Sequence, residues 1–558
     1  MCGLIGALLT EPSLTAERIA GALATIAHRG PDHTGWWCSP DRRTVLGHVR
    51  LSIIGLDNGS QPLASADGEV RCVVNGELYG YRAIRSALKA EGRHFASDSD
   101  SEIALHLYEK LGGDFVHQLR GEFAVVIADQ RRRSLIAVRD RFGIKPLFYT
   151  VQGGDVLVAS EIKALLALGA PARWDAAAFF AECHNVRTAD RTLFAGIRAV
   201  PPGCALVARD GQVEIRPYWD TDYPSREVLA ADGRSEADIV SGFREVLDNA
   251  VADRLVADVE VASYLSGGID SSAVLGLAQG KANRPIRAFT IVFGEKLYNE
   301  ERLAQQTAEL LGATFVPVPI SQRDLAEAFP DALWHAETLV FNGHGVAKYL
   351  LSRTVRDAGI KVVFTGEGAD EILGGYAPFR RDVLLHNTEQ QPQDDIEKLL
   401  AELDATNTRT VLPTFILTVL GDRMEMAHSV EGRVPFLDHH VAEYAAQVPV
   451  HHKIRGLREK HVLREAVRHC VLPEVYDRQK HPFMSPPARD IDDALAVFCQ
   501  DTLRSRSVED QPFFNPCRIR GLMDQVAAME PADRAAFEGV VLRIVSTCIL
   551  QQRFGLAS

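Results

Sequence analysis

The sequence lacks the cysteine and histidine patterns of disulfide scaffolds and zinc sites. Its nine cysteines are scattered and odd in number, they form no C-x-x-C pair, and no H-E-x-x-H segment occurs. This usage fits a reducing compartment better than a disulfide framework or a zinc site. We therefore expect a cytoplasmic protein.

Long apolar runs and a basic excess are also missing. The longest apolar runs, such as residues 411–420, are too short to span a bilayer, and the N-terminus reaches Glu11 without a basic segment before it. We therefore expect no membrane segment and no signal peptide. The 61 basic and 74 acidic residues give a net charge of −13, which argues against a nucleic-acid partner.

What the chain does contain is a glycine-rich segment, residues 266–272, between two apolar segments. Residues 259–265 are typical of a buried strand, and residues 273–278 are typical of the start of a helix. A strand, a glycine-rich turn and a helix together direct unpaired backbone N–H groups at an anion. The residues that would contact a phosphate there are Ser266, Gly267, Gly268, Ser271 and Ser272.

Asp270 lies in the same segment and indicates a metal ion. A carboxylate repels phosphates, but Asp270 is explained if it holds a Mg²⁺ that bridges to them. The segment is not a Walker A loop, because it lacks the closing Gly-Lys-Ser/Thr. It resembles the pyrophosphate loop of the ATP-pyrophosphatase enzymes, which split ATP between the α- and β-phosphates. The alternative is a plain Ser/Gly turn between a strand and a helix.

The N-terminus carries a second candidate site at Cys2. Cysteine is small, so we expect Met1 to be removed, which would place a thiol and a free α-amine on one residue. Their reference pKa values of about 8.5 and about 7.7–8.0 are close enough for the amine to act as the general base of the thiol. Residues 4–9 are typical of a strand that would bury this terminus. The alternative is an ordinary buried cysteine after the initiator Met.

Four further clusters follow Cys2 in the sequence. They are a polar turn at 28–32, a strand at 47–54, an apolar strand at 73–79 that ends in Asn-Gly, and an acidic segment at 99–102 before a helix. Taken together, they resemble the glutaminase domain of class II glutamine amidotransferases, an N-terminal-nucleophile fold. The resemblance implies an α+β domain with four layers in the order αββα.

This resemblance also implies a role for each residue. Cys2 would attack the glutamine amide, and the Asn75 side chain and the Gly76 N–H would form the oxyanion hole. Arg50 would bind the α-carboxylate with its bidentate fork. The other glutamine-binding positions are Glu77 and Asp100 near the α-amine, and Leu51, Ile53 and Ile54 along the pocket. Taken singly, Arg50 could be a surface charge, Asn75-Gly76 a hairpin turn and Asp100 a helix cap.

The 558 residues suggest more than one domain. We assign residues 2–220 to the glutaminase domain. Residues 221–238 are polar and charged without an apolar period, so we expect a linker there. We assign residues 239–558 to a second domain, which opens with a helix at 239–255.

In the second domain, strand and helix segments alternate. The expected strands are residues 287–293, 313–320 and 360–366, and a helix is expected at 300–311. Continuous apolar strands alternating with helices predict an α/β domain with a parallel sheet covered on both faces, here with helical additions. Ligands of such sheets bind at the carboxyl ends of the strands, where the loop at 365–371 and the 266–272 segment both lie. Residues 387–410 are polar, and we expect a surface insertion there.

The loop at 365–371 resembles a Ser-Gly-Glu-Gly-Ser-Asp-Glu signature of one family. The resemblance implies that Asp370 joins Asp270 on Mg²⁺ and that Glu367 acts on the acceptor or its adenylate. It also implies nucleotide contacts from Thr365, Gly366 and the backbone of Leu265 and Ile291. Lys460 matches a lysine that stabilises charge during adenylation and amidation, although a lysine at a helix start is usually solvated. Residues 431–438 match a further motif, for which a buried ion pair before a helix is the alternative.

By this point the resemblance covers nearly the whole chain, and it is to asparagine synthetase of the glutamine-hydrolysing type. It implies that Cys2 releases ammonia from glutamine and that the ammonia crosses an internal tunnel. The second domain would adenylate a carboxylate, most simply that of aspartate, with ATP and Mg²⁺, and ammonia would then displace AMP. The expected partners are small-molecule substrates, and a homodimer stays open.

The segments expected around the acceptor depart from the family. Members that make asparagine carry Thr-Thr-x-Arg after Glu-Thr, whereas here residues 337–338 are followed by 339–346 without the threonine pair or the arginine. Residues 481–487 also replace a polar, glycine-rich loop. We therefore hypothesise that the acceptor is not free aspartate. An α-carboxylate held by Lys348 or Arg380 would contradict this.

Three functions stay open at this stage. The first is asparagine synthetase itself, and the second is amidation of another carboxylate in a natural-product or surface-polymer pathway. The third is a catalytically silent regulator that binds glutamine or nucleotide. A lactam-forming relative is disfavoured, because those relatives have lost the cysteine that this chain keeps as Cys2.

Overall fold

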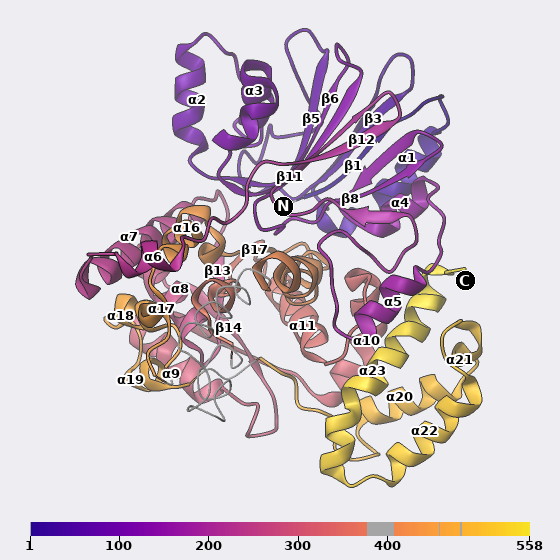
Figure 1. The fold of residues 1–558 in the computed structure, drawn as a ribbon, viewed down its shortest axis with the longest axis vertical. Coiled ribbons are helices and arrows are strands. Elements are labelled where there is room, and N and C mark those ends of the chain that lie inside the picture. The colour runs from indigo at the N-terminus through magenta and orange to yellow at the C-terminus, as the bar shows by residue number, and fades with distance from the viewer. Residues whose placement is uncertain (1, 377–406, 457, 480–482, 558) are drawn as a thin grey trace.

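The computed structural model describes residues 2–376, 407–456, 458–479 and 483–557. Arg380 and nearly all of the insertion expected at 387–410 lie outside these ranges. Two regions stand one above the other in Figure 1, and the N-terminus lies where they meet. Within the described residues, no helix is both long enough and apolar enough to cross a membrane.

The N-terminal region contains two six-stranded antiparallel sheets. The first has the order β10 (Ile197–Ala199), β8 (Phe148–Gln152), β9 (Asp155–Ala159), β1 (Cys2–Leu8), β3 (Thr44–Arg50), β2 (His33–Cys38). The second has the order β12 (Gln212–Pro217), β11 (Cys204–Arg209), β7 (Ser134–Arg139), β6 (Gly121–Asp129), β5 (Val70–Leu78), β4 (Leu63–Ala64).

Alternation of side chains explains why these sheets stack. In β1, Leu4 is buried in the cluster between the sheets, whereas Ile5 packs in a second cluster that includes the outer helices. In β5, Val73 likewise faces the other sheet, and Val74 packs with helix residues such as Ile103. Successive strand residues point to opposite faces, so each sheet is buried on both sides.

Helices complete the four layers (Figure 1). They are α1 (Ala16–Thr25) and α4 (Ile162–Leu168) on the first sheet, and α2 (Tyr81–Ala90) and α3 (Glu102–Leu111) on the second, with short 3₁₀ turns at Ala27–Arg29 and Gly112–Gln118. The αββα arrangement is therefore confirmed.

Two local expectations were wrong. Strand β3 ends at Arg50, so Leu51–Ile54 form a loop. Asn75-Gly76 lie inside β5 rather than at its end.

The C-terminal region is built on a five-stranded parallel sheet. Its order is β15 (Thr314–Pro319), β14 (Arg287–Val292), β13 (Val261–Tyr264), β16 (Val362–Phe364), β17 (Glu431–Arg433). One face packs on α7 (Glu236–Arg254), α8 (Ile269–Gln279), α9 (Glu301–Leu311) and α18 (His461–Val467), and the other on α10 (Gln322–Ala336) and α11 (His344–Asp357). The parallel sheet with helices on both faces is thus confirmed. The chain order reverses at β13, where such sheets bind ligands.

Two boundaries differ from expectation. Helix α8 begins at Ile269, not near Ala273, so Asp270 lies in its first turn. The segment expected as a linker contains a short helix, α6 (Arg226–Ala230), and α7 already begins at Glu236. The cause is a capping box at Ser235 and Asp238, which starts α7 on polar residues where no apolar period is visible.

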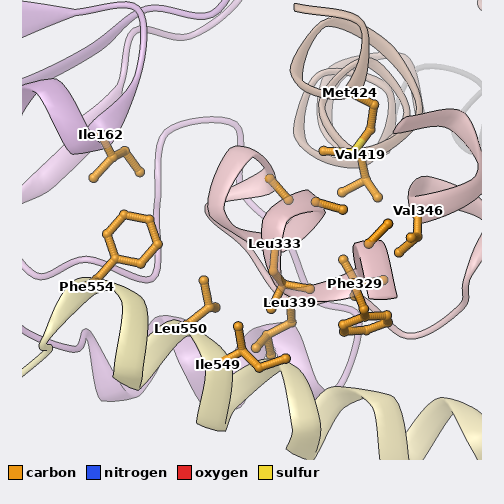
Figure 2. Close-up of a cluster of buried hydrophobic side chains, with 14 of the residues drawn as sticks. Ile162, Phe329, Leu333, Leu339, Val346, Val419, Met424, Ile549, Leu550 and Phe554 are labelled. Atoms are coloured by element: carbon orange, nitrogen blue, oxygen red, sulfur yellow. The ribbon is translucent and has the colours of Figure 1, made fainter. Parts of the chain in front are cut away.

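Helix α5 (Ala176–Cys183) belongs to the N-terminal part of the chain but packs on the C-terminal helices, where Phe179 stacks on Phe513. The remaining helices of the C-terminal region are α12 (Ala369–Leu373), a π-helical segment (Asn407–Asp422), α15 (Arg423–Met426), a 3₁₀ turn (Pro435–Leu437), α16 (His439–Ala446), α17 (Val450–Lys453), α19 (Pro473–Asp477), α20 (Ala494–Arg504), α21 (Ser507–Asp510), α22 (Pro516–Ala528) and α23 (Pro531–Phe554). Figure 2 shows Ile549 and Leu550 of α23 near Leu333 and Leu339, and Phe554 pointing toward Ile162, within one buried apolar cluster.

Helix α23 also carries a buried carboxyl, Glu538, which accepts a hydrogen bond from the Ala488 N–H at 2.7 Å. Burial raises the pKa of Glu538 from 4.5 to about 7. The folded state therefore favours the protonated form, and this contribution to stability is full below pH 4.5 and lost as the pH rises through about 7.

We predict that Glu538→Gln becomes more stable than the wild type as the pH rises, because the amide keeps the acceptor oxygen without the charge. The difference in the free energy of unfolding should grow between pH 5 and pH 7 by up to about 3 kcal/mol and then level off. Urea unfolding over this pH range measures it. The control is Glu530→Gln, at the exposed residue just before this helix. A pH-independent difference for Glu538→Gln would contradict the prediction.

Candidate active sites and the interface between them

Cys2 opens β1 beside Arg50, its partner across the sheet. Its backbone N–H donates to the Asn75 Oδ1 at 2.9 Å, and its carbonyl accepts from the Arg29 Nε at 3.0 Å. Burial raises the pKa of the Cys2 thiol, and the backbone of Leu51 and the charge of Arg50 oppose the rise. The structure thus brings together Cys2, Arg50, Leu51 and Asn75, which the sequence analysis placed in one pocket.

Asn75 and Gly76 present an unused donor next to Cys2. The Asn75 Oδ1 accepts from Cys2, and the buried Nδ2 has no hydrogen-bond partner among the described residues. Gly76 has a φ of +145°, and a Cβ there would lie 1.9 Å from the Glu122 carbonyl oxygen. Only glycine fits this position in β5. The arrangement suits an oxyanion, which needs donors that are not already satisfied.

Arg50 is held by a tight loop. Its guanidinium donates to the carbonyls of Ile54 at 3.1 Å, Gly55 at 2.6 Å and Leu56 at 3.3 Å. Residues 51–56 therefore fold around this side chain, which explains why Ile53 and Ile54 lie in a loop rather than in the strand. The same contacts fix the orientation of the guanidinium that was expected to bind a carboxylate.

Two acids lie together in this pocket. Asp100 accepts from the Leu78 N–H at 2.7 Å, and burial raises its pKa. Burial, with a further contribution from Asp100, raises the pKa of Glu77 well above its ordinary value. A cation such as an amine would stabilise both carboxylates. Glu77 also forms an ion pair at 3.3 Å with Arg433 of the C-terminal region, a contact that the sequence did not reveal.

The Ser266 segment folds on itself at the carboxyl end of β13. The Ser266 N–H donates to the Ser271 Oγ at 3.0 Å, and the Gly268 N–H donates to the Ser266 Oγ at 3.2 Å. Gly267 is held by Glu300 through its N–H at 3.2 Å. Ser272 is fully buried, and its hydroxyl donates to the Gly268 carbonyl, so it supports the turn from behind. The turn ends at the N-terminus of α8, which favours anions.

Asp270 and Asp370 converge on one cation. The Lys460 Nζ lies 2.7 Å from both carboxylate oxygens of Asp270 and 2.5 Å from the Asp370 Oδ1. Lys460 is fully buried and has a φ of +55°, so the backbone directs this ammonium at the two acids. Burial and the nearby Asp370 raise the pKa of Glu371 to about 7. Two carboxylates that meet at one position are oxygen ligands of the kind that Mg²⁺ prefers, so these residues fit the ion.

A cavity of about 390 Å³ opens above these residues. Of the positions expected to bind nucleotide, metal or acceptor, those that line it are Leu265, Ser266, Asp270, Ser271, Ile291, Thr365, Gly366, Glu367 and Asp370. The lining does not include Gly267, Gly268, Ser272 or Lys460. The structure thus gathers two loops, nearly a hundred residues apart in the sequence, around one space.

The rest of the cavity wall is apolar and aromatic. Phe341 and His344 come from the segment after Glu337-Thr338, and Phe483 and Met484 from the segment near 481–487. Both segments where the chain departs from its family therefore reach the same cavity. Phe415, from the π-helical segment, joins them and was not expected, because an isolated phenylalanine in an apolar run gives no sign of its neighbours.

Lys348 lies at this end of the cavity but is already paired. Its Nζ is 3.0 Å from the Glu367 Oε1 and 3.2 Å from the Glu425 Oε1. Burial raises the pKa of Glu425 to about 7, although Lys348 opposes the rise. Glu367 and Glu425 also border a second, small cavity of about 10 Å³, next to Ile144 and Lys145 of the N-terminal region.

Buried ion pairs join the two regions. Arg29 binds Glu161 at 2.8 Å and Asp422 at 2.9 Å, and all three side chains are almost fully buried. Arg423 continues the network to Glu337 at 2.8 Å. Glu337 in turn accepts from the N–H groups of Ile162 and Lys163, each at 2.8 Å. Glu337 thus serves the interface rather than the acceptor.

A second network lies beside it. Glu122 binds Lys145 at 3.2 Å and Arg254 at 2.9 Å, and Arg254 binds Asp438 at 2.9 Å. The Glu431–Arg433 pair at 2.6 Å confirms the buried ion pair considered for residues 431–438.

Comparison with known proteins finds two families that match different parts of the chain. Residues 1–219 match the family described as "Glutamine amidotransferase domain", and residues 242–544 match the family described as "Asparagine synthase". The chain is 34% identical to "Amidase chry2" of Gibberella zeae, over all of this chain and 99% of that protein. It is 35% identical to "Amidase chyE" of Penicillium rubens, over 87% and 89% of the two chains. It is 31% identical to "Asparagine synthetase (glutamine-hydrolyzing) 3" of Bacillus subtilis, over 87% of each.

We predict that Lys460→Met makes the protein more responsive to Mg²⁺. Without the ammonium, Asp270 and Asp370 repel each other, and a divalent cation relieves this repulsion without displacing a side chain. At 10 mM MgCl₂ the melting temperature of the variant should rise by roughly 3 °C more than that of the wild type. The control is Lys281→Met, which removes a more exposed lysine paired with Asp248. An equal rise in all three proteins would show that these two acids do not hold the ion.

Proposed function

The chain belongs to the asparagine synthase family, and we propose that it transfers ammonia from glutamine to the carboxyl group of an acid other than free aspartate. Glutamine would be hydrolysed in the N-terminal domain, within residues 2–220. A carboxylate would be activated with ATP in the C-terminal domain, within residues 239–558. The single observation that carries the proposal is the position of Glu367, which borders both the large cavity and the small cavity against Lys145.

In the first half-reaction, the Cys2 thiol attacks the amide carbon of glutamine. Once Met1 is removed, the α-amine of Cys2 takes the thiol proton, and Asn75 already binds that nitrogen. The Asn75 Nδ2 and the Gly76 N–H stabilise the oxyanion. Arg50 binds the α-carboxylate of glutamine, and Glu77 and Asp100 favour its α-ammonium group. Ammonia leaves, and water releases glutamate.

In the second half-reaction, the acceptor carboxylate attacks the α-phosphorus of ATP and pyrophosphate leaves. The Ser266 segment and the N-terminus of α8 bind the phosphates, and Leu265 and Ile291 lie where the adenine would contact the backbone. Asp270 and Asp370 would hold Mg²⁺, which neutralises phosphate charge. Ammonia then attacks the acyl-adenylate carbon, AMP leaves, and one proton is released. Glu367 and Lys348 lie where the acceptor carboxyl would react.

Ammonia must cross between the two half-sites without being diluted or protonated. The small cavity next to Ile144 and Lys145 supports a route through the interface, because Thr365 and Glu367 line both this cavity and the large one. Asp422 of the Arg29 network and Lys145 of the Glu122 network also line it. Exclusion of water along such a route prevents side reactions of the acyl-adenylate.

The charge of the cavity supports an acceptor other than aspartate. Aspartate presents an α-carboxylate that needs a cation. Among the described residues of the lining, Lys348 is the only lysine or arginine, and its ammonium is shared by Glu367 and Glu425. Pyrophosphate release with MgATP and ammonium, with and without aspartate, tests this point. Strong aspartate-dependent release with asparagine formed would contradict the proposed acceptor and leave asparagine synthesis as the function.

We predict that Cys2→Ala lowers glutamate formation from glutamine by at least about 1000-fold, because no other group supplies the nucleophile. Binding of MgATP, measured by calorimetry, should be unchanged, since the two sites are separate. Cys38→Ala, which removes a cysteine far from the pocket, is the matched control. A Cys2→Ala protein that hydrolyses glutamine like the wild type would favour a regulatory role over catalysis.

A further inference from the structure

The acceptor end of the large cavity is built from stacked rings. Phe341 and Phe415 stack at 5.0 Å with their planes 16° apart. The ring of His344 lies 5.6 Å from Phe415 and 5.9 Å from Phe341, edge-on to both. Phe483 lies 6.3 Å from His344 on a nearly parallel plane. All four residues line the cavity, so a bound acid meets aromatic side chains in this part of the wall.

Two arginines hold these rings from outside the cavity lining. The Arg187 guanidinium lies 4.5 Å from the centre of the Phe415 ring, and the Arg543 guanidinium lies 5.0 Å from that of Phe341. Arg187 also binds Glu182, and Arg543 donates to the Asn185 Oδ1 at 2.6 Å. The rings are therefore fixed before any acceptor binds, which lowers the entropy cost of binding.

His344 has hydrogen-bonding capacity that the protein does not use. Its side chain is 3% exposed, and neither ring nitrogen has a hydrogen-bond partner among the described residues. Burial lowers the pKa of His344 to about 4, so at neutral pH the ring is uncharged, with one donor and one acceptor nitrogen. Buried polar atoms are normally satisfied, and a group on a ligand would satisfy these.

We propose that the acceptor is an aromatic carboxylic acid that carries a neutral hydrogen-bonding substituent. The proposal rests on the amidotransferase function above and names its acceptor class. The ring lies against Phe341, Phe415 and Phe483, the substituent meets His344, and the carboxylate points to Glu367 and Lys348. An aryl acid brings one carboxylate, the reacting one, and thus needs no second cation in the wall.

The test is pyrophosphate release by the full chain with MgATP and ammonium, with a panel of acids. The panel is benzoate, its three hydroxy isomers, cyclohexanecarboxylate, which is similar in size but not aromatic, and aspartate. We expect kcat/KM for at least one hydroxybenzoate to exceed those for cyclohexanecarboxylate and for aspartate by at least about tenfold. Equal or higher values for cyclohexanecarboxylate or aspartate would overturn the proposal while leaving the amidotransferase function in place.

Variants test whether the preference for a hydroxybenzoate depends on the aromatic rings and on His344. Phe415→Leu and Phe341→Leu should lower kcat/KM for the preferred hydroxybenzoate at least about tenfold, because an apolar side chain remains but the ring is lost. His344→Phe should lower kcat/KM for that isomer more than kcat/KM for benzoate, and so abolish the preference between the two acids. Phe180→Leu, at an exposed phenylalanine of α5, is the control and should change neither value. Retention of the preference in His344→Phe would overturn the role of His344.

Calorimetric titration of the same acids distinguishes the proposed aromatic acceptor from the proposed amidotransferase function. Binding of a hydroxybenzoate that Phe415→Leu weakens, without pyrophosphate release for any acid, would support the aromatic site and count against the adenylation reaction. Neither binding nor release with any aryl acid, while glutamine is still hydrolysed, would overturn the aromatic acceptor.

Discussion

The arrangement of both sites depends on charges buried between the two domains. Arg29, Glu161 and Asp422 lie almost without solvent contact, as do Glu122, Lys145 and Arg254. Desolvation of such groups costs several kcal/mol for each ion, and removal of one partner typically destabilises a protein by about 3–5 kcal/mol. Their geometry admits little variation, since each charge must be matched. The networks thus act less as a source of stability than as a device that sets the position of one domain on the other.

This positioning reaches the reacting atoms. The guanidinium of Arg29 that binds Asp422 also donates to the Cys2 carbonyl. Arg433, at the edge of the parallel sheet, contacts Glu77 in the proposed glutamine pocket. On the other side, Lys348 and Glu425 connect the interface to Glu367. Arg433 of the C-terminal domain thus contacts the N-terminal pocket, and both domains line the small cavity. The described lining of the large cavity comes from the C-terminal domain.

Local sequence patterns predicted the two kinds of sheet and the segments that carry the candidate sites. The parallel sheet follows from continuous apolar strands, and the Ser266 segment and Cys2 were identified because their chemistry depends on neighbours in the sequence. The interface was largely missed, because a buried ion pair such as Arg29–Asp422 joins residues almost four hundred positions apart. A charged residue in a turn looks the same whether it is solvated or paired. Glu337 is one example: the sequence showed only that it precedes a segment expected at the acceptor, and the structure places its carboxylate at the first N–H groups of α4.

Errors at element ends have physical causes too. Asn75-Gly76 resembles a hairpin turn by composition, but Gly76 is needed because the neighbouring Glu122 carbonyl leaves no room for a Cβ. The start of α7 was missed because a capping box begins a helix on polar residues. The aromatic wall was predicted only as a departure from the family, since the rings of Phe341, Phe415 and Phe483 come from three separate segments that meet only after folding.

The shared ion networks also bear on how this protein could change over generations. A glutaminase domain exchanged with that of a relative would bring Arg29, Glu161 and Lys145 to a surface that must already carry their counter-ions. The domains are covalently consecutive, yet they are not independent modules. Recombination at the connecting segment is therefore constrained, whereas Phe341, His344 and Phe483 take part in none of these buried interdomain ion pairs. Acceptor choice is the part of this architecture that is free to diversify.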